Sequence, residues 1–227
     1  MVKEKEKNKM NLFLGIDLGG RKKRTTGICF LKDEYGKISI FKIEEIFGKE
    51  VLEKINPYLN QTKVIAIDAP LTKGRGKGRF RLYEKFLSTK IFRKEKVNPL
   101  PPALMLNFSF FAQSLVRKLK DNGFVLDINL IETFPTFLKK IVNQDFYLKT
   151  VGQKMNSFRN ENQSSAYLCA ILAYLHFNLK TKYLGYKDGF LFLPDFSFWK
   201  KSWQRKFLKA WQEKSKIKYH HLKTNLF

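Results

Sequence analysis

Two apolar runs in this chain end in an aspartate that is followed at once by a turn. Residues 12–17 read Leu-Phe-Leu-Gly-Ile-Asp17, and residues 64–68 read Val-Ile-Ala-Ile-Asp68. Short apolar runs bounded by turn residues predict buried β-strands. Each strand would present a carboxylate at its carboxyl end, where the loops of a sheet open into a cleft. If the two strands lie side by side, Asp17 and Asp68 meet at one edge of the sheet.

The order of the elements predicts an α/β fold. Three strand-like segments come first and are separated by short turns, which is typical of an antiparallel meander. Helices and strands then alternate, which favours a mixed sheet with helices on both faces. The strands are expected at residues 12–16, 26–31, 37–43, 64–67, 124–131 and 189–193, and the helices at residues 45–56, 80–90, 103–121 and 161–179.

The chain divides into one domain and two basic ends. Residues 1–10 form a charge run that we expect to be a solvated tail, and residues 11–195 carry the α/β pattern. Residues 196–227 begin with an amphipathic helix, predicted at residues 198–218, whose aromatic side chains recur every four residues. This stripe predicts docking on the core of the domain, with a basic outer face. It consists of Trp199, Trp203, Phe207 and Trp211.

The charge balance is strongly basic. The 227 residues include 44 Lys and Arg against 20 Asp and Glu, a net charge of +24. Such a balance favours nucleic acid as the partner through counterion release, although a compositionally biased genome offers another explanation. Cys29 and Cys169 lie far apart in apolar segments, which predicts buried thiols in a cytoplasmic protein. We see no signal peptide and no apolar run of about 20 residues, so we expect no membrane partner.

A third acid, Glu132, closes the apolar run that begins at residue 124. Asp17, Asp68 and Glu132 would then converge at one sheet edge, where clustered carboxylates need a compensating charge. Carboxylate oxygens suit Mg²⁺ or Mn²⁺, and two such ions about 4 Å apart support phosphodiester hydrolysis. Two alternatives stay open. One is acid–base catalysis by Glu132 and one aspartate without a metal; the other is that each acid only caps a turn or a helix.

Basic residues follow each of the two strand-end aspartates. A glycine-rich loop comes after Asp68 and a basic cluster comes after Asp17, so both can hold phosphates beside the acids. The alternative is a solvated loop of long side chains. The loop lacks the spacing of a Walker A motif and is not interpreted as an ATP site. The candidate nucleic-acid contacts are Arg21, Lys22, Lys23, Arg24, Lys73, Arg75, Lys77, Arg79 and Arg81.

Three motifs in order resemble those of the domain-of-unknown-function 429 family. They are Gly15-Ile-Asp17-Leu-Gly-Gly, Ala66-Ile-Asp68-Ala-Pro-Leu and Ile131-Glu132-Thr-Phe-Pro135, with Arg81-Leu-Tyr-Glu84 and Leu100-Pro-Pro102 between them. The resemblance covers about residues 11–195 and implies a nuclease of RNase H-like fold. It implies three antiparallel strands followed by parallel ones. Asp17 and Asp68 would end the first and fourth strands, and Glu132 would match a further strand acid.

One position departs from the family pattern. Family members tend to carry another Asp in a late helix, where this chain has Ser165. Glu161 lies four residues earlier, one helical turn away on the same face. Three interpretations stay open: Glu161 reaches back into the site, the site has lost a metal ligand and its catalysis, or Glu161 is an ordinary first-turn acid.

These residues predict a metal-dependent nuclease that hydrolyses DNA or RNA. Its catalytic residues would be Asp17, Asp68, Glu132 and Glu161, the first three binding Mg²⁺ or Mn²⁺, with no small-molecule cofactor. The alternative is a non-catalytic nucleic-acid-binding protein with a degenerate RNase H-like site. A third reading is an actin-like or sugar-kinase-type ATPase, since residues 15–20 resemble a first phosphate loop, but no second such motif is visible. The sequence distinguishes neither DNA from RNA nor endo- from exonuclease action, and it gives no oligomeric state.

Overall fold

The computed structural model describes residues 10–19, 25–73, 80–143, 146, 150–152, 158–214 and 221–226. Its centre is a five-stranded sheet in the order β3-β2-β1-β4-β5. The meander consists of β1 (Asn11–Asp17), β2 (Thr25–Glu34) and β3 (Lys37–Phe47), paired antiparallel. β4 (Thr62–Asp68) and β5 (Leu130–Glu132) extend the sheet in parallel with β1. The predicted mixed α/β sheet is therefore confirmed.

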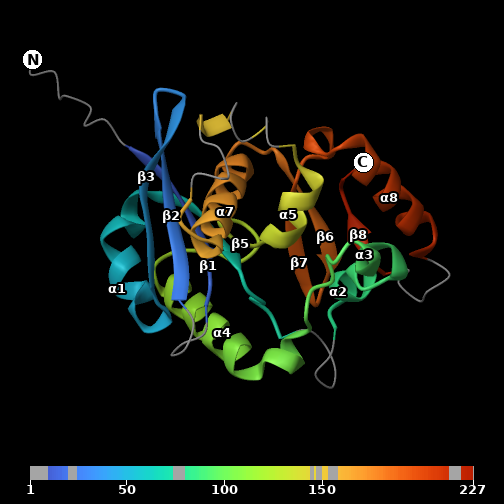
Figure 1. Cartoon of the computed structure of the whole chain (residues 1–227). Coiled ribbons are helices and arrows are strands. Elements are labelled where there is room, and N and C mark those ends of the chain that lie inside the picture. The colour runs from blue at the N-terminus through green and yellow to red at the C-terminus, as the bar shows by residue number, and fades with distance from the viewer. Residues whose placement is uncertain are drawn as a thin grey trace, which may run out of the picture.

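Helices cover both faces of this sheet because its central strands are apolar on both sides. Along β1, Phe13 joins the core under α7 (Glu161–Phe177), whereas Leu14 and Ile16 join the core on the opposite face. That opposite face is covered by α1 (Val51–Ile55) and α4 (Leu106–Asp121). Figure 1 shows α7 crossing the sheet, with contacts to β1, β2 and β4.

A second, antiparallel sheet was not predicted. It has the order β7-β6-β8 and consists of β6 (Thr181–Tyr186), β7 (Gly189–Pro194) and β8 (Lys223–Thr224). Near it in Figure 1 lie α2 (Leu82–Leu87), α3 (Lys90–Lys94), α5 (Pro135–Ile141) and α8 (Lys201–Gln212). The core under α7 includes Leu184 and Leu191 of this sheet, so the two sheets share one core.

The aromatic stripe of the C-terminal region docks on the core, as predicted. Trp199, Trp203 and Phe207 are buried. The Phe207 ring lies 5.3 Å from the Phe86 ring and 6.2 Å from the Phe92 ring. The helix itself is shorter than expected, since it runs from Lys201 to Gln212. This burial joins α8 to α2 and α3.

Two other predicted elements differ in length. Of the strand expected at residues 124–131, only Leu130–Glu132 is extended. Before it, the Val125 carbonyl accepts the amides of residues 128, 129 and 130, and Asp127 has φ of 66°, so the backbone forms a turn. The helix expected at residues 45–56 is broken, because β3 continues to Phe47 and α1 is flanked by 3₁₀ turns at Gly48–Glu50 and Asn56–Gln61.

Two further predicted helices differ in form from the observed ones. The helix expected at residues 103–121 begins as a 3₁₀ turn, Pro102–Met105, and continues as α4. The helix expected at residues 80–90 divides into α2 and α3. Cys29 and Cys169 are free, buried thiols, as predicted.

Candidate active site

Asp17 and Asp68 lie side by side at the carboxyl ends of β1 and β4. The strands are parallel, and Asp17 pairs in register with Asp68. Neighbouring strands are about 4.8 Å apart, and paired residues point to the same face of the sheet. Both side chains are half-buried. The structure thus brings these two acids together, and they are named the aspartate pair below.

Two glycines bring α7 close to the aspartate pair. A Cβ on Gly15 would lie 2.1 Å from the carbonyl oxygen of Ala166, and one on Gly27 would lie 2.2 Å from that of Asn162. Because glycine has no Cβ, the helix approaches β1 and β2 more closely than any other residue would allow. Gly27 is the β2 partner of Asp17. The first turns of α7 are therefore held next to the aspartate pair.

Polar side chains from α5 and α7 adjoin the aspartate pair. Lys139 Nζ donates to Glu161 Oε1 and to Ser165 Oγ, both at 3.1 Å. The buried Ser165 hydroxyl in turn favours the ionised form of the Asp17 side chain. Glu161 is the first residue of α7, and its side chain is 84% exposed. The position expected to lack a carboxylate thus belongs to a polar chain that runs from Lys139 through Ser165 to Asp17.

The aspartate pair is short of positive charge. Burial raises the pKa of Asp17 to about 6; the Lys139 ammonium opposes this rise, and the Glu161 carboxylate adds to it. Burial also raises the pKa of Asp68 well above its usual range, and repulsion from Asp17 and Glu132 adds to the effect. Neighbouring carboxylates in a partly dry site favour protonation. A further cation beside the pair would therefore favour its ionised form.

Glu132 lies near Asp68, but its carboxylate is bound by other partners. Its carboxylate accepts two hydrogen bonds from Arg81 at 2.7 Å, one from the Leu71 amide at 2.9 Å and one from the Tyr83 hydroxyl. A carboxylate offers about four lone-pair sites, so these donors occupy all of them. This differs from the expectation that Glu132 binds a metal, because its oxygens are already committed to the protein.

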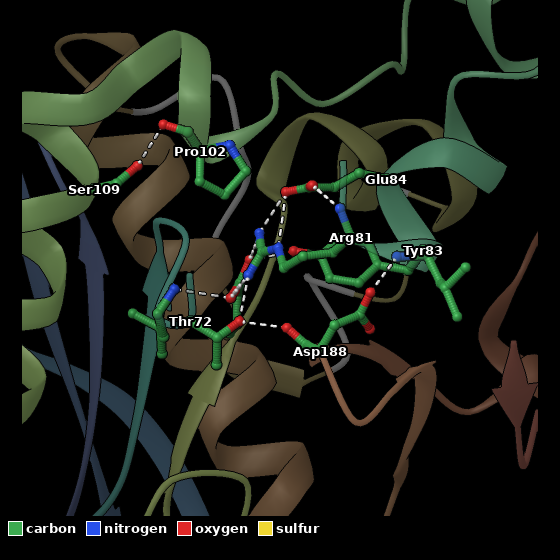
Figure 2. A network of polar contacts seen from close by, with 10 residues as sticks. Thr72, Arg81, Tyr83, Glu84, Pro102, Ser109 and Asp188 are labelled. Atoms are coloured by element: carbon green, nitrogen blue, oxygen red, sulfur yellow. Dashed lines mark hydrogen bonds and ion pairs between the residues drawn. The ribbon is translucent and has the colours of Figure 1, made fainter. Parts of the chain in front are cut away.

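Arg81 is the centre of this buried ion-pair network, which comprises Arg81, Tyr83, Glu84 and Glu132. Figure 2 shows its guanidinium beside Glu84, to which it donates at 2.5 and 2.9 Å. Arg81 was expected to contact nucleic acid, but its side chain is 2% exposed and lies between two carboxylates. It therefore holds the framework of the site rather than a phosphate from solvent.

Thr72 and Asp188 extend the network to the second sheet. The Thr72 hydroxyl accepts from Arg81 Nη1 at 3.1 Å and donates to the Asp188 carbonyl at 2.8 Å (Figure 2). The Asp188 side chain accepts the Leu82 amide at 2.8 Å. These bonds tie the loop after β4 and the start of α2 to the turn between β6 and β7.

The structure places few of the predicted basic contacts. Lys73 is exposed, and its Nζ lies 6.0 Å from the centre of the Phe110 ring. The others apart from Arg81 lie outside the described residues: Arg21, Lys22, Lys23, Arg24, Arg75, Lys77 and Arg79.

The aspartate pair fits one divalent cation. In the part of the chain that the structure describes, no group of three or more His, Cys, Asp or Glu is arranged to hold a metal. Mg²⁺, however, often takes only one or two carboxylates from a protein and completes its shell with water and substrate phosphates. The three carboxylates of Asp17, Asp68 and Glu161 and the Lys139 ammonium leave two negative charges when all are ionised. One divalent ion offsets these two charges, with Glu45 and Glu132 adding further repulsion, whereas the sequence had predicted two ions.

Lys139 was not among the predicted site residues, because no helix was predicted where α5 lies. A signal for this helix was present. Pro135 occupies its first turn, where proline is favoured, and the apolar side chains of Leu138 and Ile141 follow at helical spacing. The helix points Lys139 toward α7. Among the described residues, its ammonium is the one that lies within hydrogen-bonding distance of Ser165.

Comparisons with protein-family models, with curated proteins and with solved structures found no match for this chain. Among the described helices, none has the length and apolar character needed to cross a membrane.

Proposed function

We propose that this protein is a metal-dependent nuclease of RNase H-like fold that hydrolyses phosphodiester bonds in DNA or RNA. One observation carries the proposal: Asp17 and Asp68 pair in register at the ends of parallel strands, with raised pKa values and a deficit of positive charge. Perturbed acids gathered in a cleft are typical of functional sites. The basic chain, with a net charge of +24, suits a polyanionic substrate.

Asp17 and Asp68 would bind one Mg²⁺ or Mn²⁺. When bound, such an ion polarises the phosphate and lowers the pKa of a coordinated water. The Ser165 hydroxyl fixes the orientation of the Asp17 carboxylate. The Lys139 ammonium supplies the second positive charge of the site, which in a two-ion nuclease would come from another metal. Glu132 takes no direct part and holds the end of β5 through Arg81.

A second candidate, a non-catalytic nucleic-acid-binding protein, is favoured by the same lysine. The Lys139 ammonium already offsets part of the acidic charge beside Asp17 and Asp68. If it offsets enough of that charge, the site needs no metal, and the fold keeps only its affinity for phosphates. The two candidates differ in one measurable property, which is metal-dependent cleavage.

The test is cleavage of single-stranded DNA, duplex DNA, RNA and a DNA–RNA hybrid with Mg²⁺ or Mn²⁺. We expect Asp17→Asn and Asp68→Asn each to lower the rate by at least about 100-fold, as loss of a key electrostatic group does. Asp121→Asn, the same change at an exposed site at the end of α4, is the control. Undiminished cleavage in both pair variants would refute the assignment. Salt-sensitive binding without cleavage under either ion would establish the second candidate.

The role of Lys139 has its own matched control. Lys139→Met keeps the apolar stem and removes the charge, and Lys140→Met does the same at the exposed neighbouring position. If Lys139 replaces a second ion, we expect its variant to lose rate about 10- to 100-fold at saturating metal. If the lysine replaces the metal altogether, the wild type does not cleave, and the variant binds Mg²⁺ more tightly without gaining cleavage.

A further inference from the structure

A cavity of about 420 Å³ opens beside the aspartate pair. Asp68 lies in its wall, and the buried ion-pair network lines its inner side through Arg81 and Glu132. Its volume falls within the range of about 300–1,000 Å³ that is common for pockets binding small organic groups. Anything bound in it would touch one of the two acids proposed to act on the phosphate.

The walls of the cavity suit a flat aromatic group. Phe108, Met105 and Phe134 contribute apolar side chains, and aromatic faces bind nucleobases by stacking. Polar groups also line the cavity, among them the ion-pair network, Asn98 and Thr136, so the apolar faces lie beside groups that can orient a ligand. A sugar or a phosphate alone would leave these apolar faces without a partner.

Thr133 gives the cavity an unused polar group. It lines the cavity and is 2% exposed, and its hydroxyl has no hydrogen-bond partner among the described residues. Buried hydroxyls are ordinarily paired because an unpaired one destabilises the fold. The edge of a nucleobase offers both donors and acceptors for such a group.

Lys96 gives the cavity a cation at its rim. It is exposed and lines the opening. It follows α3 with φ of 57°, in the left-handed region where glycine is usual at the end of a helix. Lys96 adopts this conformation although it is not glycine, and its exposed ammonium is available to a phosphate at the cavity.

We infer that this cavity takes one unstacked nucleobase of the strand whose phosphate lies at the aspartate pair. The inference rests on the proposed nuclease function and sharpens it. The enzyme would act on single-stranded ends, loops or flipped nucleotides, because a base inside an intact duplex cannot enter the cavity. Cleavage would fall at the phosphate adjoining the bound base.

Nucleoside binding without divalent ions tests the cavity separately from catalysis. Adenosine, guanosine, cytidine and uridine are titrated into the full chain by calorimetry, with ribose 5-phosphate as the probe that lacks a base. We expect at least one nucleoside to bind more tightly than ribose 5-phosphate does. Ribose 5-phosphate binding as tightly as every nucleoside, or no nucleoside binding up to its solubility, would overturn the inference.

Two variants distinguish a binding role from a structural one. Thr133→Val should weaken nucleoside binding about three- to tenfold, the value of one neutral hydrogen bond, without lowering the unfolding midpoint. Thr89→Val removes another unpartnered buried hydroxyl, at the start of α3, and should leave binding unchanged. Lys96→Gly should raise the unfolding midpoint yet weaken binding of a nucleoside monophosphate and not of the nucleoside. If Thr133→Val and Lys96→Gly both bind a nucleoside monophosphate as tightly as the wild type does, the inference is overturned.

An oligonucleotide with one abasic position completes the test. We expect cleavage beside the abasic nucleotide to slow at least about tenfold, because the stacking contacts of the base in the cavity are lost. Cleavage unaffected by the missing base would overturn the cavity assignment and leave the nuclease standing. Nucleoside binding without any cleavage would support the cavity and refute the nuclease, so the two failures are distinguishable.

Discussion

Asp17 is a residue that the fold keeps at a cost to its own stability. Its pKa in the folded protein is about 6, whereas its ordinary value is 3.8. Between these values the native state binds more protons than the unfolded chain, so the free energy of unfolding falls as pH rises through about 6. The stability that the folded protein gains from protonated Asp17 is fully present below about pH 4 and is lost above about pH 6. Such a cost is common where function requires a charge.

We therefore predict that Asp17→Asn stabilises the protein at neutral pH. A shift of one pKa unit corresponds to about 1.4 kcal/mol, which we discount because the side chain is half-exposed, giving a gain of about 1–2 kcal/mol at pH 8. Urea unfolding at pH 4 and pH 8 measures it, and the gain should nearly vanish at pH 4. A variant with the same pH dependence as the wild type would contradict the assigned pKa.

Metal binding should depend on pH through the same carboxyl. The ion displaces protons from Asp17 and Asp68, whose pKa values are both raised, so affinity for Mg²⁺ or Mn²⁺ should rise with pH through about 6. Calorimetry in buffers of different ionisation enthalpy counts the protons released. Affinity that is constant between pH 5 and pH 8 would refute metal binding at Asp17.

Glu132 should be more important for stability than its suspected role as a ligand suggests. Removing its carboxylate keeps Arg81 paired with Glu84 but leaves buried donors of Arg81, Tyr83 and the Leu71 amide without their acceptor, at about 1–3 kcal/mol for each unsatisfied group and about 3–5 kcal/mol together. We predict this loss for Glu132→Ala, and about 1 kcal/mol for Tyr83→Phe, which removes one hydrogen bond to the same carboxylate. Glu53→Ala, an exposed site on α1, is the control. If Glu132→Ala unfolds at the wild-type urea concentration, the network is not structural.

At the scale of elements, the close contact of α7 with the sheet sets the geometry of the site. Only a residue without a Cβ fits at Gly15 and Gly27. We predict that Gly15→Ala destabilises the fold by about 1–3 kcal/mol through overpacking and moves Ser165 away from Asp17, so catalysis falls too. Gly36→Ala, in the turn between β2 and β3 at φ of 80° with no atom near its Cβ position, should lose stability through backbone strain and keep activity. Equal activity in the two variants would contradict this account.

An element could be predicted when its own residues carried the pattern of a helix or strand. β1, β4 and α7 have long apolar runs, and their positions followed from the sequence. β8 was missed because it has only two residues and pairs with β6 about 40 residues away, whereas β6 forms a local hairpin with β7 whose first strand was not predicted. The strand expected from residue 124 was too long because Asp127 adopts a left-handed turn, which its apolar neighbours do not signal.

At the scale of the whole molecule, the sequence could place acids on strands but not choose their partners. Register in a parallel sheet brought Asp17 to Asp68, as the strand-end pattern suggested. Glu132 has the same local pattern, yet Arg81, 51 residues away, takes its carboxylate. Lys139 and Ser165 meet only because α5 and α7 pack together. Such long-range pairings decide the chemistry of a site and leave no trace in local spacing.

The net charge of +24 gives the last prediction. If the chain evolved to hold a strand along several phosphates, affinity for a single-stranded 20-mer should fall at least about 100-fold between 50 and 200 mM salt. Lys73→Gln, beside Phe110, should lower the slope of log affinity against log salt by about 0.7–1, whereas Lys37→Gln in the distant turn should not change it. Fluorescence anisotropy with a labelled strand measures both slopes. A shallow slope that neither variant changes would mean that the basic composition reflects the genome rather than a nucleic-acid partner.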